Sequence, residues 1–135
     1  MKITKGVAAL VAEASAEIET WSVAEALAHH GDEDLVFVDI RDVRELQREG
    51  LIAGAYHAPR GMLEFWVDPE SPYHKEIFAS GKRFVLYCGA GQRSALATRT
   101  LKEMGLAPVC HIEGGFAAWA QAGGPVEARE RKPKA

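Results

Sequence analysis

One cysteine lies in a segment whose composition suits nucleophilic chemistry. Cys88 follows an apolar run, residues 84–87, and precedes the loop 89–94, which contains two glycines and no proline. Gly89 and Gly91 permit backbone angles that side chains disfavour. Amides that curl around one point at the start of a helix bind an anion or a thiolate. The segment therefore predicts a reactive thiol at the carboxyl end of a buried strand, where open α/β sheets bind ligands.

The six residues after Cys88 are expected to bind the substrate. They are Gly89, Ala90, Gly91, Gln92, Arg93 and Ser94. Their amides favour the thiolate, and the same amides could hold the negatively charged outer sulfur of a persulfide. Arg93 is the only cation of the loop, so we expect modest binding of a small dianionic donor. The alternative interpretation is that Cys88 is a small buried apolar residue that ends a strand.

Short apolar runs predict the strands that position this loop. They cover residues 35–38, 84–87 and 108–112. The runs do not alternate clearly between apolar and polar residues, which is typical of parallel strands buried on both faces. Between them, Ser22 and Asp42 are the expected N-caps of helices, and Glu45 completes a capping box with Asp42. Strands that alternate with helices predict an α/β fold with a helix-covered, mostly parallel sheet.

The length predicts one domain with additions at both ends. The chain has 135 residues, of which 47% are hydrophobic and 26% charged, as is ordinary for a globular protein with its own core. We expect an N-terminal amphipathic helix in residues 1–18, the α/β domain in residues 19–126 and a flexible C-terminal tail in residues 127–135. One face of the first helix is apolar: Val7, Leu10, Val11, Ala14 and Ile18.

Composition also argues against several classes of function. A formal net charge of −3 disfavours nucleic-acid binding driven by electrostatics, and no membrane attachment is expected. Two cysteines are too few for a disulfide-rich secreted domain, so a cytoplasmic location is expected. The histidines show no metal-ligand spacing, and most are expected at the surface: His29, His30, His57, His74 and His111. Neither a metal nor another cofactor is expected.

Three segments, in order, carry a family resemblance. CGAGQRS resembles the active-site loop of rhodanese-homology domains. VDIRDVRELQREGLIAGAYHAP is similar to the family's strand–DxR–helix–GHIxGAxxxP stretch, and MGLAPVCHIEGGFAAW to its closing strand and GGxxxW helix. The resemblance extends from Thr20 to Pro125. Leu51 departs from the pattern, because the family usually has histidine there; that position serves packing and a turn, so we expect no change in activity.

The resemblance implies a rhodanese-like, doubly wound α/β fold with helices on both faces of the sheet. It also implies a sulfurtransferase in which Cys88 takes a sulfane sulfur from a small donor such as thiosulfate. The resulting persulfide passes its outer sulfur to a thiol or to cyanide. Two alternatives stay open: a persulfide carrier that works with a partner protein in a sulfur relay, and a non-catalytic rhodanese-like binding domain.

A phosphatase is the other enzyme class to consider. Tyrosine-phosphatase loops read C-x5-R, and cell-cycle phosphatases related to the rhodanese family carry that longer loop. In this chain four residues separate Cys88 from Arg93. The shorter loop is expected to suit a single sulfur atom better than a tetrahedral phosphoryl group.

Other candidates have structural interpretations as well. Asp39, Arg41 and Glu45 are expected to order the turn after the first long strand, with Glu45 as a partner of Arg41. Arg60 is a possible anion contact near the sulfur, although a solvated loop arginine is equally consistent with the sequence. Cys110 falls in a predicted buried strand, which disfavours a redox role. Phe65 and Trp66 lie in an irregular excursion, residues 60–81, and either form an apolar rim near Cys88 or anchor that excursion. Phe116 and Trp119 are expected to pack and close the fold.

Overall fold

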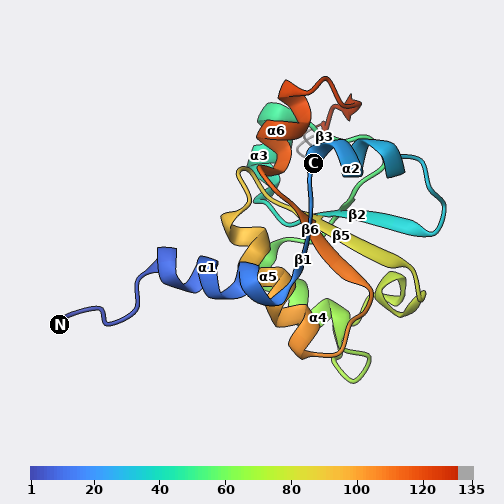
Figure 1. The fold of residues 1–135 in the computed structure, drawn as a ribbon. Helices are drawn as coiled ribbons and strands as arrows, with labels where there is room; N and C mark the ends of the chain where they lie inside the picture. Colours follow the sequence, from blue (N-terminus) through green and yellow to red (C-terminus); the bar gives the residue numbers. More distant parts are fainter. Residues whose placement is uncertain (131–135) are drawn as a thin grey trace, which may run out of the picture.

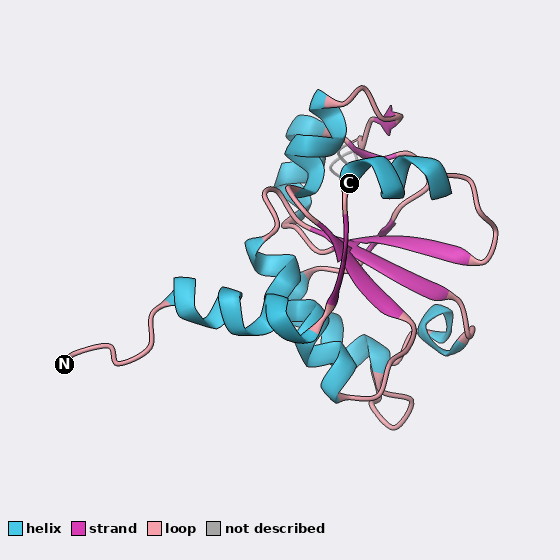
Figure 2. Cartoon of the chain, viewed as in Figure 1, coloured by secondary structure: helices cyan, strands magenta, loops and turns pink. Residues whose placement is uncertain are grey.

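A parallel sheet with helices on both faces forms the body of the protein (Figures 1 and 2). The computed structural model describes residues 1–130. Within them, the five-stranded sheet has the order β1-β6-β5-β2-β4, and all its pairings are parallel. Its strands are β1 (Glu19–Trp21), β2 (Leu35–Asp39), β4 (Tyr56–His57), β5 (Arg83–Tyr87) and β6 (Val109–Ile112). The predicted α/β fold with a mostly parallel sheet is confirmed.

Helices connect the strands. The α-helices are α1 (Val7–Glu17), α2 (Val23–His29), α3 (Val43–Glu49), α4 (Leu63–Val67), α5 (Gln92–Glu103) and α6 (Gly115–Gln121). Two 3-10 turns, η1 (Arg60–Met62) and η2 (Glu76–Ala79), flank α4 in the excursion. Ser22 caps α2, and Asp42 forms a reciprocal capping box with Glu45 at the start of α3, as predicted. These caps satisfy amides that have no partner inside the helix.

Side chains that point alternately to the two faces of the sheet form two hydrophobic cores, one on each face. Phe84, Leu86 and Cys88 face the core to which α4 and α5 contribute. Val85 and Tyr87 face the opposite core, to which α2 and α6 contribute. Successive side chains of a strand point to opposite faces. The strand β5, which ends just before Cys88, is apolar from Phe84 to Tyr87 because both faces are covered. Cys88 therefore lies where β5 ends, on the face covered by α5.

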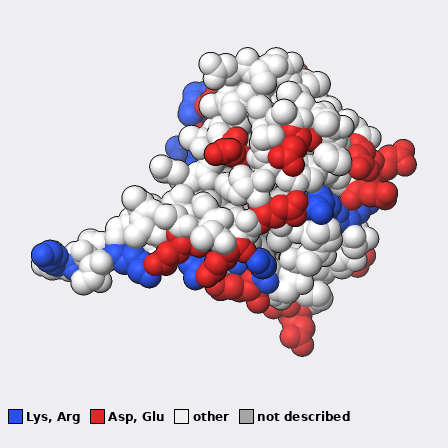
Figure 3. All heavy atoms as spheres, in the orientation of Figure 1, with Lys and Arg blue, Asp and Glu red and all other residues white. Residues whose placement is uncertain are grey.

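Helix α1 extends the structure beyond this sheet. Its buried contact is Ala14, and Val7 and Leu10 on the same predicted apolar face are largely solvent-exposed. Ion pairs link it to α5: Arg99 contacts Glu17 at 2.8 Å and Glu13 at 3.9 Å. Figure 3 shows acidic and basic side chains interspersed along this part of the surface. The predicted helix is present. A small apolar contact and the ion pairs of Arg99 attach it to α5.

The C-terminal segment contains a strand that we did not predict. Val126 and Glu127, the strand β7 (Val126–Glu127), pair antiparallel with Ile52 and Leu51 of β3 (Leu51–Ile52). The flexible tail expected from residue 127 is therefore wrong at Glu127, because backbone pairing holds it. Residues 131–135 of that expected tail lie outside the described residues. No helix within residues 1–130 is both long and apolar enough to cross a membrane.

Candidate active site

The thiol of Cys88 lies at the junction between β5 and α5. Its Sγ accepts hydrogen bonds from the amides of Gly91, at 3.2 Å, and Ser94, at 3.3 Å. Gly91 is the N-cap of α5 and has a φ of +105°, a conformation that glycine adopts without a Cβ penalty. Two of the loop amides thus point at the sulfur at the positive end of a helix, an arrangement that favours negative charge on the sulfur.

The other loop residues surround this contact. Gly89 is half-buried next to the Arg93 guanidinium, whereas Ala90 and Gln92 are exposed. Gln92 is the first residue of α5. Cys88 itself is only 1% exposed. The six predicted loop residues therefore lie around one nearly buried thiol.

Ser94 connects the thiol to a histidine. Its Oγ lies 3.5 Å from Cys88 Sγ, 2.9 Å from His111 Nδ1 and 3.3 Å from the Gly91 carbonyl oxygen. His111 is buried, and burial lowers its pKa to about 4, so the imidazole is neutral near pH 7. Most of the histidines are expected at the surface, but His111 is buried in the strand β6. Its position inside the predicted strand 108–112 was the sequence signal that it would be buried.

The start of α6 supports the loop from behind. The amides of Phe116 and Ala117 donate to the carbonyls of Cys88, at 2.8 Å, and Gly89, at 3.0 Å. A Cβ on Gly115 would lie 2.5 Å from the Cys88 carbonyl oxygen, and Gly115 has a φ of +58°. Only glycine allows this approach. The GG motif is visible in the sequence, but its contact with the thiol loop is not.

The loop cation is paired with a carboxylate. Arg93 donates to both carboxylate oxygens of Glu45, at 2.8 and 3.0 Å. These hydrogen bonds and the charge of Arg93 lower the pKa of Glu45 despite its partial burial. The expected pairing of Glu45 with Arg41 is wrong. Glu45 lies in α3 and pairs with Arg93 of α5 instead. The positive charge predicted near the sulfur is consequently neutralised in part.

Arg41 instead forms a buried pair with Asp39. Neither side chain is exposed, and Arg41 Nη2 lies 2.8 Å from Asp39 and 2.7 Å from the Gly50 carbonyl. Burial by itself would lower the pKa of Arg41, but the hydrogen bonds and charge of Asp39 raise it. The guanidinium also lies 4.3 Å from the ring centre of Phe116 in α6. The pair thus joins the turn after β2 to the helix that supports the thiol loop.

The remaining candidates lie in other environments. Arg60 pairs with Glu64 at 2.7 Å. Trp66 packs against the core that includes Cys88, while Phe65 is exposed and contacts Tyr73 edge to face. Cys110 is fully buried, and burial raises its pKa to about 12, so it is protonated near neutral pH. Within residues 1–130, no cluster of three potential metal ligands occurs.

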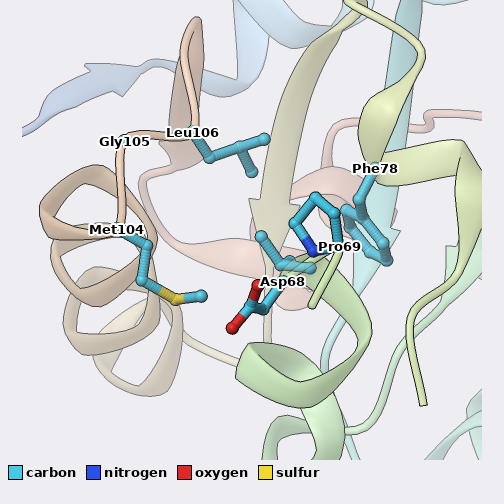
Figure 4. A pocket seen from close by; sticks show the side chains of 7 residues that line it. Asp68, Pro69, Phe78, Met104, Gly105 and Leu106 are labelled. Carbon is cyan, nitrogen blue, oxygen red and sulfur yellow. The ribbon is translucent and has the colours of Figure 1, made fainter. Parts of the chain in front are cut away.

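Two concavities lie at opposite ends of α5. The loop-side pocket, about 540 Å³, is lined by Val11, Ser15, Thr20, Ser22, Glu25, Ala90, Gly91, Gln92, His111, Glu113 and Gly114. A second pocket of about 370 Å³ lies between the end of α5 and α4, where Met104 and Leu106 face Pro69 and Phe78 (Figure 4). The second pocket contains no residue of the thiol loop, so the loop-side pocket is the one relevant to Cys88.

The fold and this loop define an α/β protein with a single thiol presented at a helix start. Residues 22–122 match the family described as rhodanese-like domain. The chain belongs to that family. A sulfurtransferase of Allochromatium vinosum is 32% identical over 114 residues, which cover 84% of this chain and 96% of that protein.

Other relatives differ in length or in description. A Rhodopseudomonas palustris structure is 56% identical with a TM-score of 0.92 and covers 94% of this chain and 98% of that one; it is described as a protein of unknown function and possible tyrosine phosphatase. The chain spans about half the length of an uncharacterised Synechocystis protein, to which it is 34% identical. It spans 43% of a Bacillus subtilis protein, 31% identical, whose name describes a candidate sulfur carrier.

Proposed function

We propose that the protein is a sulfurtransferase that moves a sulfane sulfur through a persulfide on Cys88. The Cys88 thiolate attacks the outer sulfur of a donor such as thiosulfate, the donor S–S bond breaks, and sulfite leaves with the bonding pair. An acceptor thiolate, or cyanide, then attacks the outer sulfur of the persulfide, and Cys88 leaves as thiolate. The observation that carries this proposal is the Cys88 sulfur with two amide donors at the start of α5.

The loop residues have distinct roles in this proposal. The amides of Gly91 and Ser94 stabilise the thiolate, and the loop from Gly89 to Ser94 binds the transferred sulfur. Asp39 and Arg41 hold the turn after β2 in place. A cytoplasmic location is part of the proposal, because both cysteines are free and buried and the cytosol keeps thiols reduced.

The ion pair at the loop supports a second function, that of a persulfide carrier in a sulfur relay. Glu45 engages both nitrogen donors that Arg93 directs toward it, so a small dianion such as thiosulfate meets a cation whose charge is largely compensated. A partner protein that delivers sulfur from its own persulfide does not need that cation. The name of the Bacillus subtilis relative favours this second candidate.

The phosphatase description of the Rhodopseudomonas palustris relative finds less support in this loop. A phosphoryl group has three equatorial oxygens that need several donors, and phosphate-binding loops commonly use an arginine for bidentate contacts. Here Arg93 is directed to Glu45 instead. The four-residue spacing between Cys88 and Arg93 also leaves a tighter loop than C-x5-R.

The test is the intact mass of the protein after incubation with thiosulfate, inorganic polysulfide or glutathione persulfide. We expect a gain of one sulfur in the wild type and no gain in Cys88→Ser. Cys110→Ala should also gain one sulfur, because the Cys110 thiol of the wild type is buried and protonated. Cyanide should remove the added sulfur as thiocyanate. Adduct formation from glutathione persulfide but not thiosulfate would favour the carrier. No adduct with any donor, together with hydrolysis of p-nitrophenyl phosphate, would contradict both.

A further inference from the structure

The nearly buried thiol needs a route by which its proton reaches water. Cys88 is 1% exposed and Ser94 is fully buried, so water has little direct access to the S–H group. The Ser94 hydroxyl lies within reach of Cys88 Sγ on one side and of His111 Nδ1 on the other, at 3.5 and 2.9 Å. His111 in turn lines the loop-side pocket together with Ala90 and Gln92. These contacts form a continuous chain from the sulfur to a surface pocket.

We propose that Ser94 and His111 form a hydrogen-bonded relay that takes up the Cys88 proton toward the loop-side pocket and leaves the thiolate with a hydroxyl donor, with His111 as the positioning residue that sets the direction of that hydroxyl. This relay goes beyond the proposed sulfur transfer, since it describes how the thiol becomes a thiolate whatever the thiolate then attacks. It assigns a function to a histidine that lies in the predicted buried strand 108–112.

The proton transfer balances without any other reactant. In the thiol state, Cys88 donates its proton to Ser94 Oγ, and the Ser94 hydroxyl donates to an unprotonated Nδ1 of His111. On ionisation the Sγ proton moves to Ser94 Oγ, the former hydroxyl proton moves to Nδ1, and Nε2 releases its proton to water. The Ser94 hydroxyl then donates to the thiolate, and Nδ1–H donates to Ser94. The imidazole changes tautomer and stays neutral.

The electrostatic surroundings suit a neutral imidazole that exchanges tautomers. Burial lowers the pKa of His111 to about 4, so an imidazolium is not formed at neutral pH. The charged groups that line the same pocket are Glu25 and Glu113, and Glu25 Oε1 is occupied by the amide and hydroxyl of Ser22. On the thiol side, Arg93 is the nearby cation and is paired with Glu45. None of these groups bonds to the His111 ring.

Hydrogen-bond capacity explains why a histidine serves here. Ser94 has one hydroxyl proton but three neighbours within reach: Cys88 Sγ, the Gly91 carbonyl and His111 Nδ1. A neutral imidazole can either accept at Nδ1 or donate from it, according to its tautomer. Ser94 is therefore free to accept from the thiol or donate to the thiolate without leaving a buried polar group unpaired.

The experiment measures the rate of iodoacetamide alkylation of the Cys88 peptide as a function of pH, by mass spectrometry. Loss of the hydroxyl that donates to the thiolate disfavours the charged form of the sulfur. We expect the pH of half-maximal rate to rise by about one unit in Ser94→Ala. A smaller rise in the same direction is expected in His111→Leu, and near wild-type behaviour in His111→Asn, whose amide can donate or accept at the Nδ1 position.

Matched controls separate this relay from general damage to the fold. Thr98→Val removes another buried hydroxyl of α5, one that has no hydrogen-bond partner among residues 1–130. His57→Asn replaces a half-buried histidine whose Nε2 contacts the carbonyl oxygen of Arg41, not Ser94. Both should keep the wild-type profile. An unchanged profile in a folded Ser94→Ala or His111→Leu protein would show that the relay does not stabilise the thiolate and would overturn it. If Ser94→Ala does not fold, the His111 pair decides alone. Because alkylation needs no sulfur donor, this result is independent of whether the proposed sulfur transfer is correct.

Discussion

On its inner side, the loop from Cys88 to Ser94 contacts the start of α6 through two backbone hydrogen bonds and the close approach of Gly115. On its outer side, it contacts α3 through the Arg93–Glu45 ion pair, in which the two side chains are 46% and 21% exposed. The inner contacts join backbone groups at close range, at 2.8 and 3.0 Å. The outer pair lies in water that screens it. The inner side therefore fixes the geometry of the thiol, whereas the outer side can change with little cost to the fold and is suited to select donors.

The largest effect is expected on the inner side, at Gly115. An alanine there adds a Cβ 2.5 Å from the Cys88 carbonyl oxygen, in addition to the strain of a positive φ. Left-handed backbone costs about 1–2 kcal/mol for a non-glycine residue, and overpacking adds about 1–3 kcal/mol. We expect Gly115→Ala to lower the free energy of unfolding by about 2–5 kcal/mol, measured by urea denaturation, and to abolish persulfide formation.

Gly123→Ala is the matched control for that substitution. Gly123 has a similar positive φ of +79°, but a Cβ there would meet nothing within 4 Å. It should therefore show the backbone strain alone, about 1–2 kcal/mol, and keep persulfide formation. Equal losses in the two variants would show that the approach of α6 to the loop is not what holds the thiol in place.

The next effect concerns the outer side, at Glu45. Glu45→Gln keeps a side chain that can complete the capping box with Asp42 but removes the charge that compensates Arg93. We expect the KM for thiosulfate to fall by about threefold, since an exposed ion pair contributes about 0.2–1 kcal/mol, with at most about 1 kcal/mol lost in stability. Steady-state kinetics with cyanide as acceptor measures the KM for thiosulfate. The same assay with a bulkier persulfide donor shows whether the fall in KM is specific to the dianion.

Glu64→Gln provides the comparison for Glu45. It releases Arg60, the other arginine considered as an anion contact, from its pair with Glu64. A fall in KM for thiosulfate in this variant would assign Arg60 to donor binding. No change in either variant would mean that neither arginine recognises the charge of the donor. The proposal that the outer side of the loop selects donors would then be wrong.

The same contrast explains what the sequence could predict. Local features were readable: the buried strand before Cys88, the glycines of its loop and the caps at Ser22 and Asp42 follow from residue type and spacing alone. Contacts between distant segments were not, because they depend on the order of the strands. β6 lies beside β5, which places His111 next to Ser94 and brings Gly115 to Cys88, and no local pattern encodes that neighbourhood. Glu45 was assigned to the nearer Arg41 for the same reason, although its partner is 48 residues away.

The smallest effect is the pH dependence of the outer pair. The pKa of Glu45 is lowered from its ordinary value of 4.5, mainly by the hydrogen bond from Arg93. A carboxylate with a lowered pKa in the folded state stabilises the protein above its ordinary value and loses this contribution as the pH falls through the lowered one. The difference in unfolding free energy between the wild type and Glu45→Gln should therefore be constant from about pH 6 to about pH 8, at most about 1 kcal/mol. It should shrink as the pH falls below the ordinary value of 4.5. Urea denaturation at a series of pH values checks this, and a difference that already changed near pH 7 would mean that Glu45 responds to a group other than Arg93.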